Sequence, residues 1–112
     1  MIEIHPEAAS EIPAIHRLNV QAFDHRPNEA RLVDLLRAAG KAVLSLVAVS
    51  EGEVVGHVLF SPVALDPPSA GFNGVGLGPV AASPEFQRQG IGSRLIREGL
   101  DRCRQMGYEV VV

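Results

Sequence analysis

The most regular pattern of apolar and polar residues lies between residues 91 and 106. Apolar residues recur there at steps of three, four or five positions, which gathers them on one side of a helix, and charged residues occupy the other side. The apolar positions are Ile91, Leu95, Ile96, Leu100, Cys103 and Met106. Gly107 follows them, and glycine commonly ends a helix. The pattern predicts a helix whose apolar stripe packs against a sheet.

The beginning of the chain predicts a short strand and a helix. Residues 2–5 alternate between apolar and polar, as in a strand. Residues 7–23 have the apolar spacing of a helix, but Pro13 would break a hydrogen bond inside it. The sequence therefore also allows a helix that starts near Ile12, with Pro13 in its first turn.

A second helix is expected after a loop at residues 25–28. The spacing of apolar residues predicts that it covers residues 29–39, and Gly40 is placed to end it. The side chains expected to point toward the core are Leu32, Leu35 and Leu36.

Further apolar runs predict strands, and these cover residues 44–49, 54–65, 75–82 and 108–112. The short turn at residues 50–53 joins the first two into a hairpin, and their continuous apolar character predicts cover on both faces. Residues 66–74, which are rich in Pro, Gly and Ser, are expected to form a loop. The order β-α-α-β-β-β-α-β predicts an α/β fold, with a mixed sheet and helices on its faces.

Length and composition indicate a single domain over residues 1–112, with 46% hydrophobic and 21% charged residues. No apolar run approaches the roughly 20 residues of a membrane span, and the N-terminus does not resemble a secretory signal, so no membrane partner and a cytoplasmic location are expected. The single cysteine, Cys103, lies on the apolar stripe and is expected to be a buried thiol outside any disulfide. No metal is predicted, because the histidines and this cysteine show no ligand spacing.

The net charge of −3 argues against a nucleic-acid partner. The charge is uneven, however, since five of the ten Lys and Arg residues fall within residues 88–104, namely Arg88, Arg94, Arg97, Arg102 and Arg104. Arg88 and Arg94 lie on either side of a glycine-containing turn. Basic residues at that place would suit a ligand that carries phosphate groups.

The turn in question, QRQGIG at residues 87–92, lies between a predicted strand and the predicted helix. The first N–H groups of a helix lack partners and the helix dipole attracts anions there, so the turn is a candidate anion site. Gly90 and Gly92 carry no Cβ, and a phosphate could therefore approach the backbone closely. The Gly-Lys-Ser/Thr ending of a Walker loop is absent, and the glycines of residues 74–79 do not have the dinucleotide-binding spacing.

With its surroundings, the turn resembles the acetyl-coenzyme A signature of the GNAT acetyltransferase superfamily. The family pattern is Arg or Gln, two residues, Gly, one residue, and Gly or Ala, which Gln87, Gly90 and Gly92 match. As in the family, VAAS precedes the turn, and an amphipathic helix and Gly107-Tyr108 lead from it into a strand. The resemblance covers the whole chain, most specifically residues 75–112. It implies the GNAT acyl-CoA N-acyltransferase fold, incomplete at the C-terminus, because the family domain continues with a further helix and two strands.

The resemblance also implies a function. An N-acetyltransferase of this family transfers the acetyl group of acetyl-CoA directly to a primary amine of a small molecule or a protein. The alternative is a non-catalytic coenzyme A-binding module, and an apolar strand end at residues 110–112 leaves association into a homodimer open. The residues that the resemblance assigns to the cofactor are Val80, Ala81, Ala82, Gln87, Arg88, Gln89, Gly90, Ile91, Gly92 and Ser93.

Direct attack by the amine requires no covalent enzyme intermediate, so Cys103 is not expected to be a nucleophile. By resemblance, the backbone N–H of Val80 or Ala81 would polarise the thioester carbonyl, beside a bulge expected where Gly76, Gly78 and Pro79 interrupt the strand. The loop between the first two helices lines the acceptor site in this family. The candidates for the catalytic base are His25 and Glu29 in or after that loop, with His57, Glu85 or an ordered water as alternatives.

Overall fold

The computed structural model describes residues 2–63 and 73–111, which form a five-stranded sheet with the order β1-β2-β3-β4-β5. The strands are β1 (Ile2–Pro6), β2 (Leu44–Ser50), β3 (Glu53–Val63), β4 (Gly74–Ala82) and β5 (Glu109–Val111). Neighbours from β1 to β4 are antiparallel, and β5 runs parallel to β4. The mixed sheet predicted from the sequence is confirmed. The ends of two predicted strands, at residues 64–65 and 112, and most of the predicted loop at 66–74 lie outside the described residues.

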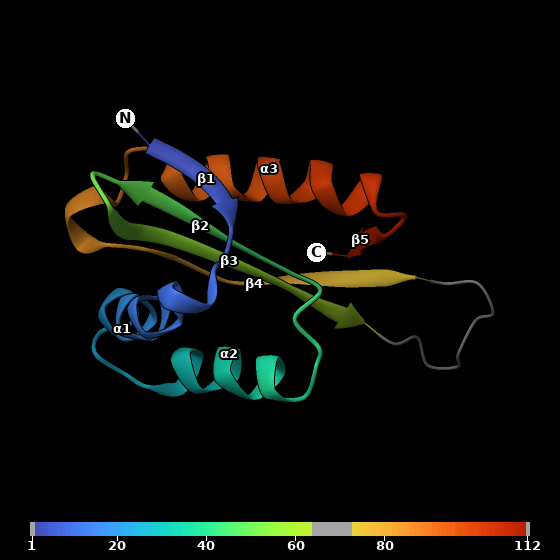
Figure 1. The fold of residues 1–112 in the computed structure, drawn as a ribbon, viewed down its shortest axis with the longest axis horizontal. Helices are drawn as coiled ribbons and strands as arrows, with labels where there is room; N and C mark the ends of the chain where they lie inside the picture. The colour runs from blue at the N-terminus through green and yellow to red at the C-terminus, as the bar shows by residue number, and fades with distance from the viewer. Residues whose placement is uncertain (1, 64–72, 112) are drawn as a thin grey trace.

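Three α-helices cover the described sheet on its two faces (Figure 1). The helices are α1 (Ile12–Ala22), α2 (Asn28–Ala38) and α3 (Ile91–Gln105), and short 3-10 turns occur at η1 (Ala9–Glu11) and η2 (Pro84–Phe86). Helices α1 and α2 lie on one face of the sheet and α3 lies on the other. Pro13 lies in the first turn of α1, so the shorter of the two helices allowed by the sequence is the one that forms.

The core has two parts because the strands are buried on both faces, as their continuous apolar runs predicted. On the side of α3, Leu46 and Phe60 pack with Leu95 of the helix. On the other side, the alternate strand residues Val47 and Leu59 pack with residues of α1 and α2.

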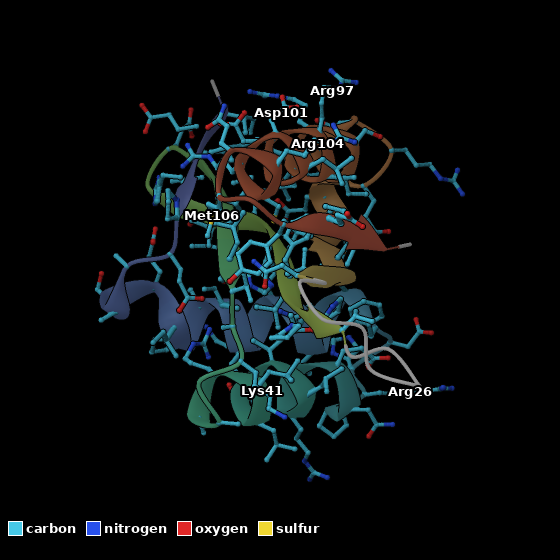
Figure 2. The ribbon with its side chains drawn as sticks, turned by 90° about the vertical axis from the view of Figure 1, so that its right-hand side faces the viewer. Arg26, Lys41, Arg97, Asp101, Arg104 and Met106 are labelled. Atoms are coloured by element: carbon cyan, nitrogen blue, oxygen red, sulfur yellow. The ribbon has the colours of Figure 1, made fainter. Side chains whose placement is uncertain are left out.

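Two expectations about helix faces are wrong. Leu32 and Leu35 of α2 are 46% and 68% exposed, and the buried residues of this helix are Ala30 and Val33. The third leucine, Leu36, packs against the core beneath α2, as expected. The smaller buried residues let α2 pack closely beside α1. Met106, which Figure 2 labels, lies just after the last residue of α3, Gln105, and is also 49% exposed.

Helix α3 lies close to the sheet because two glycines leave room for it. A Cβ at Gly99 would lie 2.2 Å from Cε2 of Phe60, far inside van der Waals contact. A Cβ at Gly56 of β3 would lie 2.7 Å from Cγ2 of Ile91 and 2.9 Å from Cδ1 of Leu95. These contacts determine how near the first turn of α3 comes to the sheet, and therefore where the turn before it lies.

Candidate functional site

Strand β4 contains a bulge in its middle. Val58 of β3 faces Val80 and Phe60 faces Leu77, so a single β3 residue lies opposite both Gly78 and Pro79. Gly78 has a φ of 131°, which a residue with a side chain rarely adopts. The bulge expected from the glycines and proline of this strand is confirmed, and it divides β4 into two halves.

The two halves of β4 differ in their partners. Strand β5 pairs with the first half, from Gly74 opposite Glu109 to Gly76 opposite Val111. In the second half, Val80 to Ala82 pair with β3 alone within the described chain. The second half of β4 therefore has an edge with backbone groups that no described strand pairs.

The register shows which backbone groups lie on that edge. The N–H of Ser83 donates to the carbonyl of Val55 at 2.8 Å, so these two residues form a hydrogen-bonded pair. Hydrogen-bonded and non-hydrogen-bonded pairs alternate along an antiparallel ladder. Ala81 therefore directs its backbone groups toward β3, while Val80 and Ala82 direct theirs toward the open edge. The Gln87 amide fits this assignment, because its Nε2 donates to the Ala82 carbonyl at 3.2 Å.

The edge leads directly into the turn before α3. Gly90 occupies the N-cap position of α3 with a φ of 82°, and Arg88 has a φ of 66°. Within the described residues, a Cβ at Gly90 would meet nothing within 4 Å, so the backbone is open at this point. An anion could approach the unpaired N–H groups at the start of α3 from this side.

The side chains in and beside the turn differ in their contacts, since some are hydrogen-bonded to the backbone, one is buried and one is exposed. Nε2 of Gln89 donates to the Glu85 carbonyl at 3.1 Å, which holds the turn together, whereas the Arg88 side chain is exposed. Ile91, the first residue of α3, is buried in the core, so only its backbone could reach a ligand. Arg94 points toward β1, where its Nη2 donates to the Ile2 carbonyl at 3.4 Å. Of the two arginines that flank the turn in sequence, Arg88 has no side-chain hydrogen bond to another described residue.

Two more members of the predicted cofactor set lie in the first turn of α3. A Cβ at Gly92 would make an ordinary contact of 3.7 Å with Cγ1 of Val80, so the helix start and the β4 edge are adjacent. Ser93 is exposed. The structure thus brings the predicted residues of β4 and of the turn together along one continuous surface.

The predicted catalytic residues lie in the loop before α2, at His25, and in the first turn of α2, at Glu29. His25 is exposed with a φ of 60°, and its N–H donates to the Val20 carbonyl at 2.9 Å. Glu29 is half-buried in the first turn of α2, beside the buried Ala30 and one turn before Val33. Its Oε2 is enclosed and has no hydrogen-bond partner among the described residues.

The other candidate bases are placed less suitably. Glu85 is exposed in η2. His57 is completely buried under α1, and Nε2 and Nδ1 of its ring both have protein partners. These bonds involve Asn19 and Ser45, which the sequence did not single out, because only the fold brings them to His57. An acceptor amine could not reach His57 in this arrangement.

The fold and the site define an α/β domain with an open strand edge that leads into a glycine-containing turn at a helix N-terminus, where an anion could bind. The model of the acetyltransferase (GNAT) family matches residues 10–112. The chain is 38% identical over 110 residues to the uncharacterised N-acetyltransferase YhbS of Escherichia coli K12, covering 97% of this chain and 64% of YhbS. The chain therefore belongs to the GNAT acetyltransferase family, and it spans just under two thirds of the length of this curated relative.

Solved structures show the same fold with the cofactor bound. A GNAT acetyltransferase from Brucella melitensis in complex with acetyl-CoA has a TM-score of 0.89 and 39% identity, and the match covers 96% of this chain and 71% of that one. YhbS from Escherichia coli in complex with CoA also has a TM-score of 0.89, at 35% identity, over 96% of this chain and 58% of that one. These matches confirm the predicted fold, and the two relatives bind acetyl-CoA and CoA.

In the described ranges, no helix is long and apolar enough to cross a membrane. No cluster of His, Cys, Asp and Glu side chains in this part of the chain could hold a metal ion. Cys103 is buried as an unpaired thiol, and burial raises its pKa, in agreement with its predicted structural role.

Proposed function

We propose that this chain is the cofactor-binding part of an N-acetyltransferase that transfers the acetyl group of acetyl-CoA directly to a primary amine of a small molecule or a protein. The observation that carries the proposal is the continuous surface from the open edge of Val80 and Ala82 to the turn at Gly90. An extended ligand with amides at one end and phosphates at the other matches this surface in shape and in hydrogen-bonding groups. Acetyl-CoA is such a ligand.

The residues of the site fit the cofactor in two places. Val80 and Ala82 offer backbone donors and acceptors to the amides of the pantetheine arm, while Ala81 contributes a small side chain. Residues 87–93 offer helix N–H groups to the pyrophosphate, and the lack of a Cβ at Gly90 leaves that approach open. The exposed Arg88 adds a positive charge beside the phosphates. The complexes of the two relatives with acetyl-CoA and CoA support this assignment.

Acetyl transfer needs a neutral acceptor amine, a close approach of this amine to the thioester, and a hydrogen-bond donor at the thioester carbonyl. The bound cosubstrate supplies an acetyl group that is activated as a thioester. The backbone N–H of Val80 faces the open edge, whereas that of Ala81 faces β3, so Val80 is the proposed donor to the thioester carbonyl, where negative charge develops. No covalent enzyme intermediate is required.

Glu29 is the proposed residue for holding or deprotonating the amine, with His25 as the alternative. An enclosed carboxylate oxygen without a partner is costly in a folded protein, unless a ligand supplies the missing donor. An acceptor ammonium group would be such a donor. His25 is nearby in sequence but exposed, so it is better placed to contact the acceptor than to activate it.

The test combines calorimetric titration of acetyl-CoA with an assay for free CoA released in the presence of an amine panel. Gly90→Glu should weaken acetyl-CoA binding by more than about tenfold, or about 1.4 kcal/mol, because it places a carboxylate in the phosphate approach. Gly90→Ala is the matched control, since it imposes the same backbone strain without the charge. Equal binding by the folded Glu and Ala variants would contradict the proposed phosphate site.

The catalytic assignment is tested separately with Glu29→Gln and His25→Asn. Glu29→Gln should lower CoA release while leaving the acetyl-CoA dissociation constant unchanged, and His25→Asn should have the smaller effect. Unchanged turnover in Glu29→Gln would remove Glu29 from the mechanism. Binding without any amine-dependent CoA release would favour the alternative, a non-catalytic coenzyme A-binding module.

The acceptor, a cytoplasmic location and a homodimer remain predictions.

A further inference from the structure

Strand β1 forms one edge of the described sheet (Figure 1). It pairs with β2 on its inner side, and within the described residues no strand pairs with its outer side. The N–H of Glu7, just after the strand, donates to the Ser45 carbonyl at 2.9 Å, so these two residues form a hydrogen-bonded pair. Because such pairs alternate along an antiparallel ladder, Glu3 and His5 also direct their backbone groups toward β2. The residues that direct their backbone groups outward are Ile2, Ile4 and Pro6.

The outward backbone groups of β1 are not equivalent. Ile4 offers both an N–H and a carbonyl. Pro6 has no N–H, so it offers only its carbonyl. Ile2 offers its N–H, because its carbonyl already accepts a hydrogen bond from Nη2 of Arg94 at 3.4 Å. A strand that pairs with this edge must therefore bring a donor and an acceptor to Ile4, an acceptor to Ile2 and a donor to Pro6.

A second copy of β1 brings this set of groups. If the two strands run antiparallel about a two-fold axis at Ile4, the N–H of each Ile4 donates to the carbonyl of the other copy's Ile4. The N–H of each Ile2 then donates to the Pro6 carbonyl of the other copy. The Ile2 carbonyl faces a Pro6 that has no N–H, and it is the carbonyl that Arg94 already binds. In this register, each outward backbone group of β1 has a partner.

The charged side chains of β1 favour the same register. With the axis at Ile4, Glu3 of one copy lies directly opposite His5 of the other, so an acidic residue faces a basic one. Sliding one strand by two residues in one direction would instead place the two Glu3 carboxylates opposite each other. Sliding it in the other direction would place the Ile4 carbonyl opposite Pro6, which has no N–H to donate. The axis at Ile4 avoids both penalties.

The other face of β1 offers apolar surface and space. Ile2 and Ile4 are half-buried there against the core beside α3. A hollow of about 280 Å³ lies next to Ile4, and its other lining residues are Arg94, Arg97, Glu98 and Asp101. Two of these residues are basic and two are acidic, so the hollow carries no net charge that would repel a second copy. The two-fold axis places the Ile4 side chains of the two copies side by side at this hollow, where each covers apolar surface of the other.

We propose that β1 is the surface through which two copies of this chain pair, with antiparallel strands centred on Ile4. The sheets of the two copies then form one continuous sheet. This edge is opposite to that of β5, and β2 and β3 separate it from β4, so the open edge of Val80 and Ala82 stays free. The contact is short, with five residues from each copy, so the dimer is in reversible equilibrium with the monomer.

Sedimentation equilibrium at increasing concentrations of the chain tests whether the dimer forms. We expect the mass to rise with concentration from the 11.9 kDa of the monomer toward twice that value. Ile4→Pro removes the outward N–H of each copy but keeps the bonds to β2, so it should raise the dissociation constant of the dimer at least about tenfold. Ile4→Val is the matched control, because it keeps the N–H and an apolar side chain. A wild-type chain that stays monomeric up to about 1 mM, or a folded Ile4→Pro variant that dimerises as well as Ile4→Val, would overturn the proposal.

Cysteine substitutions test the register without relying on a proline. Ile4→Cys places two thiols at the axis, where the facing Cα atoms are about 5.5 Å apart, a separation that a disulfide can span. Oxidised glutathione should therefore link two copies of this variant, because the two thiols are oxidised to a disulfide while the reagent is reduced to two glutathione thiols. Ile2→Cys is the matched control on the same face, since its two copies are about 14 Å apart along the strands in this register. The wild-type chain, in which Cys103 is buried, should not be linked. Linking of Ile2→Cys as fast as Ile4→Cys, or no linking of Ile4→Cys, would overturn the proposal.

Discussion

The contact between Gly99 of α3 and Phe60 of β3 gives the sharpest stability prediction. A Cβ built at Gly99 lies 2.2 Å from Cε2 and 2.5 Å from Cζ of the Phe60 ring. Carbon atoms in protein cores approach to about 3.5–4.0 Å, so Gly99→Ala requires a displacement of about 1 Å or more. Phe60 is fully buried and cannot move its ring into solvent. The helix, the strand or the ring must therefore shift within a packed core.

Two opposing effects determine the size of the change. Overpacking a core typically destabilises a protein by about 1–3 kcal/mol. Replacing a glycine inside a helix by alanine stabilises the helix by about 1 kcal/mol. Since the overlap at Phe60 is large, we expect Gly99→Ala to lower the free energy of unfolding by about 1–2 kcal/mol. The displaced helix also carries the turn at Gly90, so acetyl-CoA binding should weaken as well.

Urea denaturation followed by circular dichroism measures this change. Gly92→Ala is the matched control on the same helix, because its Cβ makes only an ordinary 3.7 Å contact with Val80. We expect it to leave stability unchanged or to raise it by up to about 1 kcal/mol. A smaller ring should relieve the overlap, so Phe60→Leu and Gly99→Ala should show a favourable coupling of about 1 kcal/mol in a double-mutant cycle. If the Gly99→Ala variant has the same free energy of unfolding and the same m-value as the wild type, the close packing of α3 against Phe60 is refuted.

Three further predictions concern other parts of the molecule. Gly90→Ala should lower the free energy of unfolding by about 1–2 kcal/mol, because the φ of 82° is unfavourable for a residue with a Cβ; no loss in a urea titration would argue against this conformation. For His57, the pKa falls from 6.5 in the unfolded chain to about 4 in the fold, so the unfolded chain binds more protons between these values. Stability should be full above pH 6.5 and should fall by about 3 kcal/mol as the pH drops to 4. His57→Gln should flatten this part of the pH profile, whereas a control at the exposed His25, His25→Asn, should keep its slope. Arg37→Leu should destabilise the chain by about 1–3 kcal/mol because it leaves the Glu7 carboxylate without its cation, and adding Glu7→Gln should recover part of the loss; equal stability of the single and double variants would show that the pair is not coupled.

Local patterns in the sequence determined the order of the elements and the nature of the turn. The spacing of apolar residues over residues 91–106 predicts α3, because that periodicity is a property of neighbouring residues. Pro13 and Gly107 mark helix ends for reasons that act within one turn of the chain. Gln87, Gly90 and Gly92, together with the strand before them and the amphipathic helix after them, pointed to acetyl-CoA through the family resemblance.

Only the tertiary structure decided features that depend on distant segments. The direction in which α2 faces follows from its packing against α1, so the periodicity alone could not show that Ala30 and Val33 are buried while Leu32 and Leu35 are exposed. The assignment of Val80 to the open edge of β4, and of Ala81 to its pairing with β3, follows from the register and not from the identities of these residues. The bond between Asn19 and His57 joins residues 38 positions apart, and it exists because α1 crosses over β3. In each case the deciding interaction is long-range, whereas sequence patterns report mainly on contacts between near neighbours.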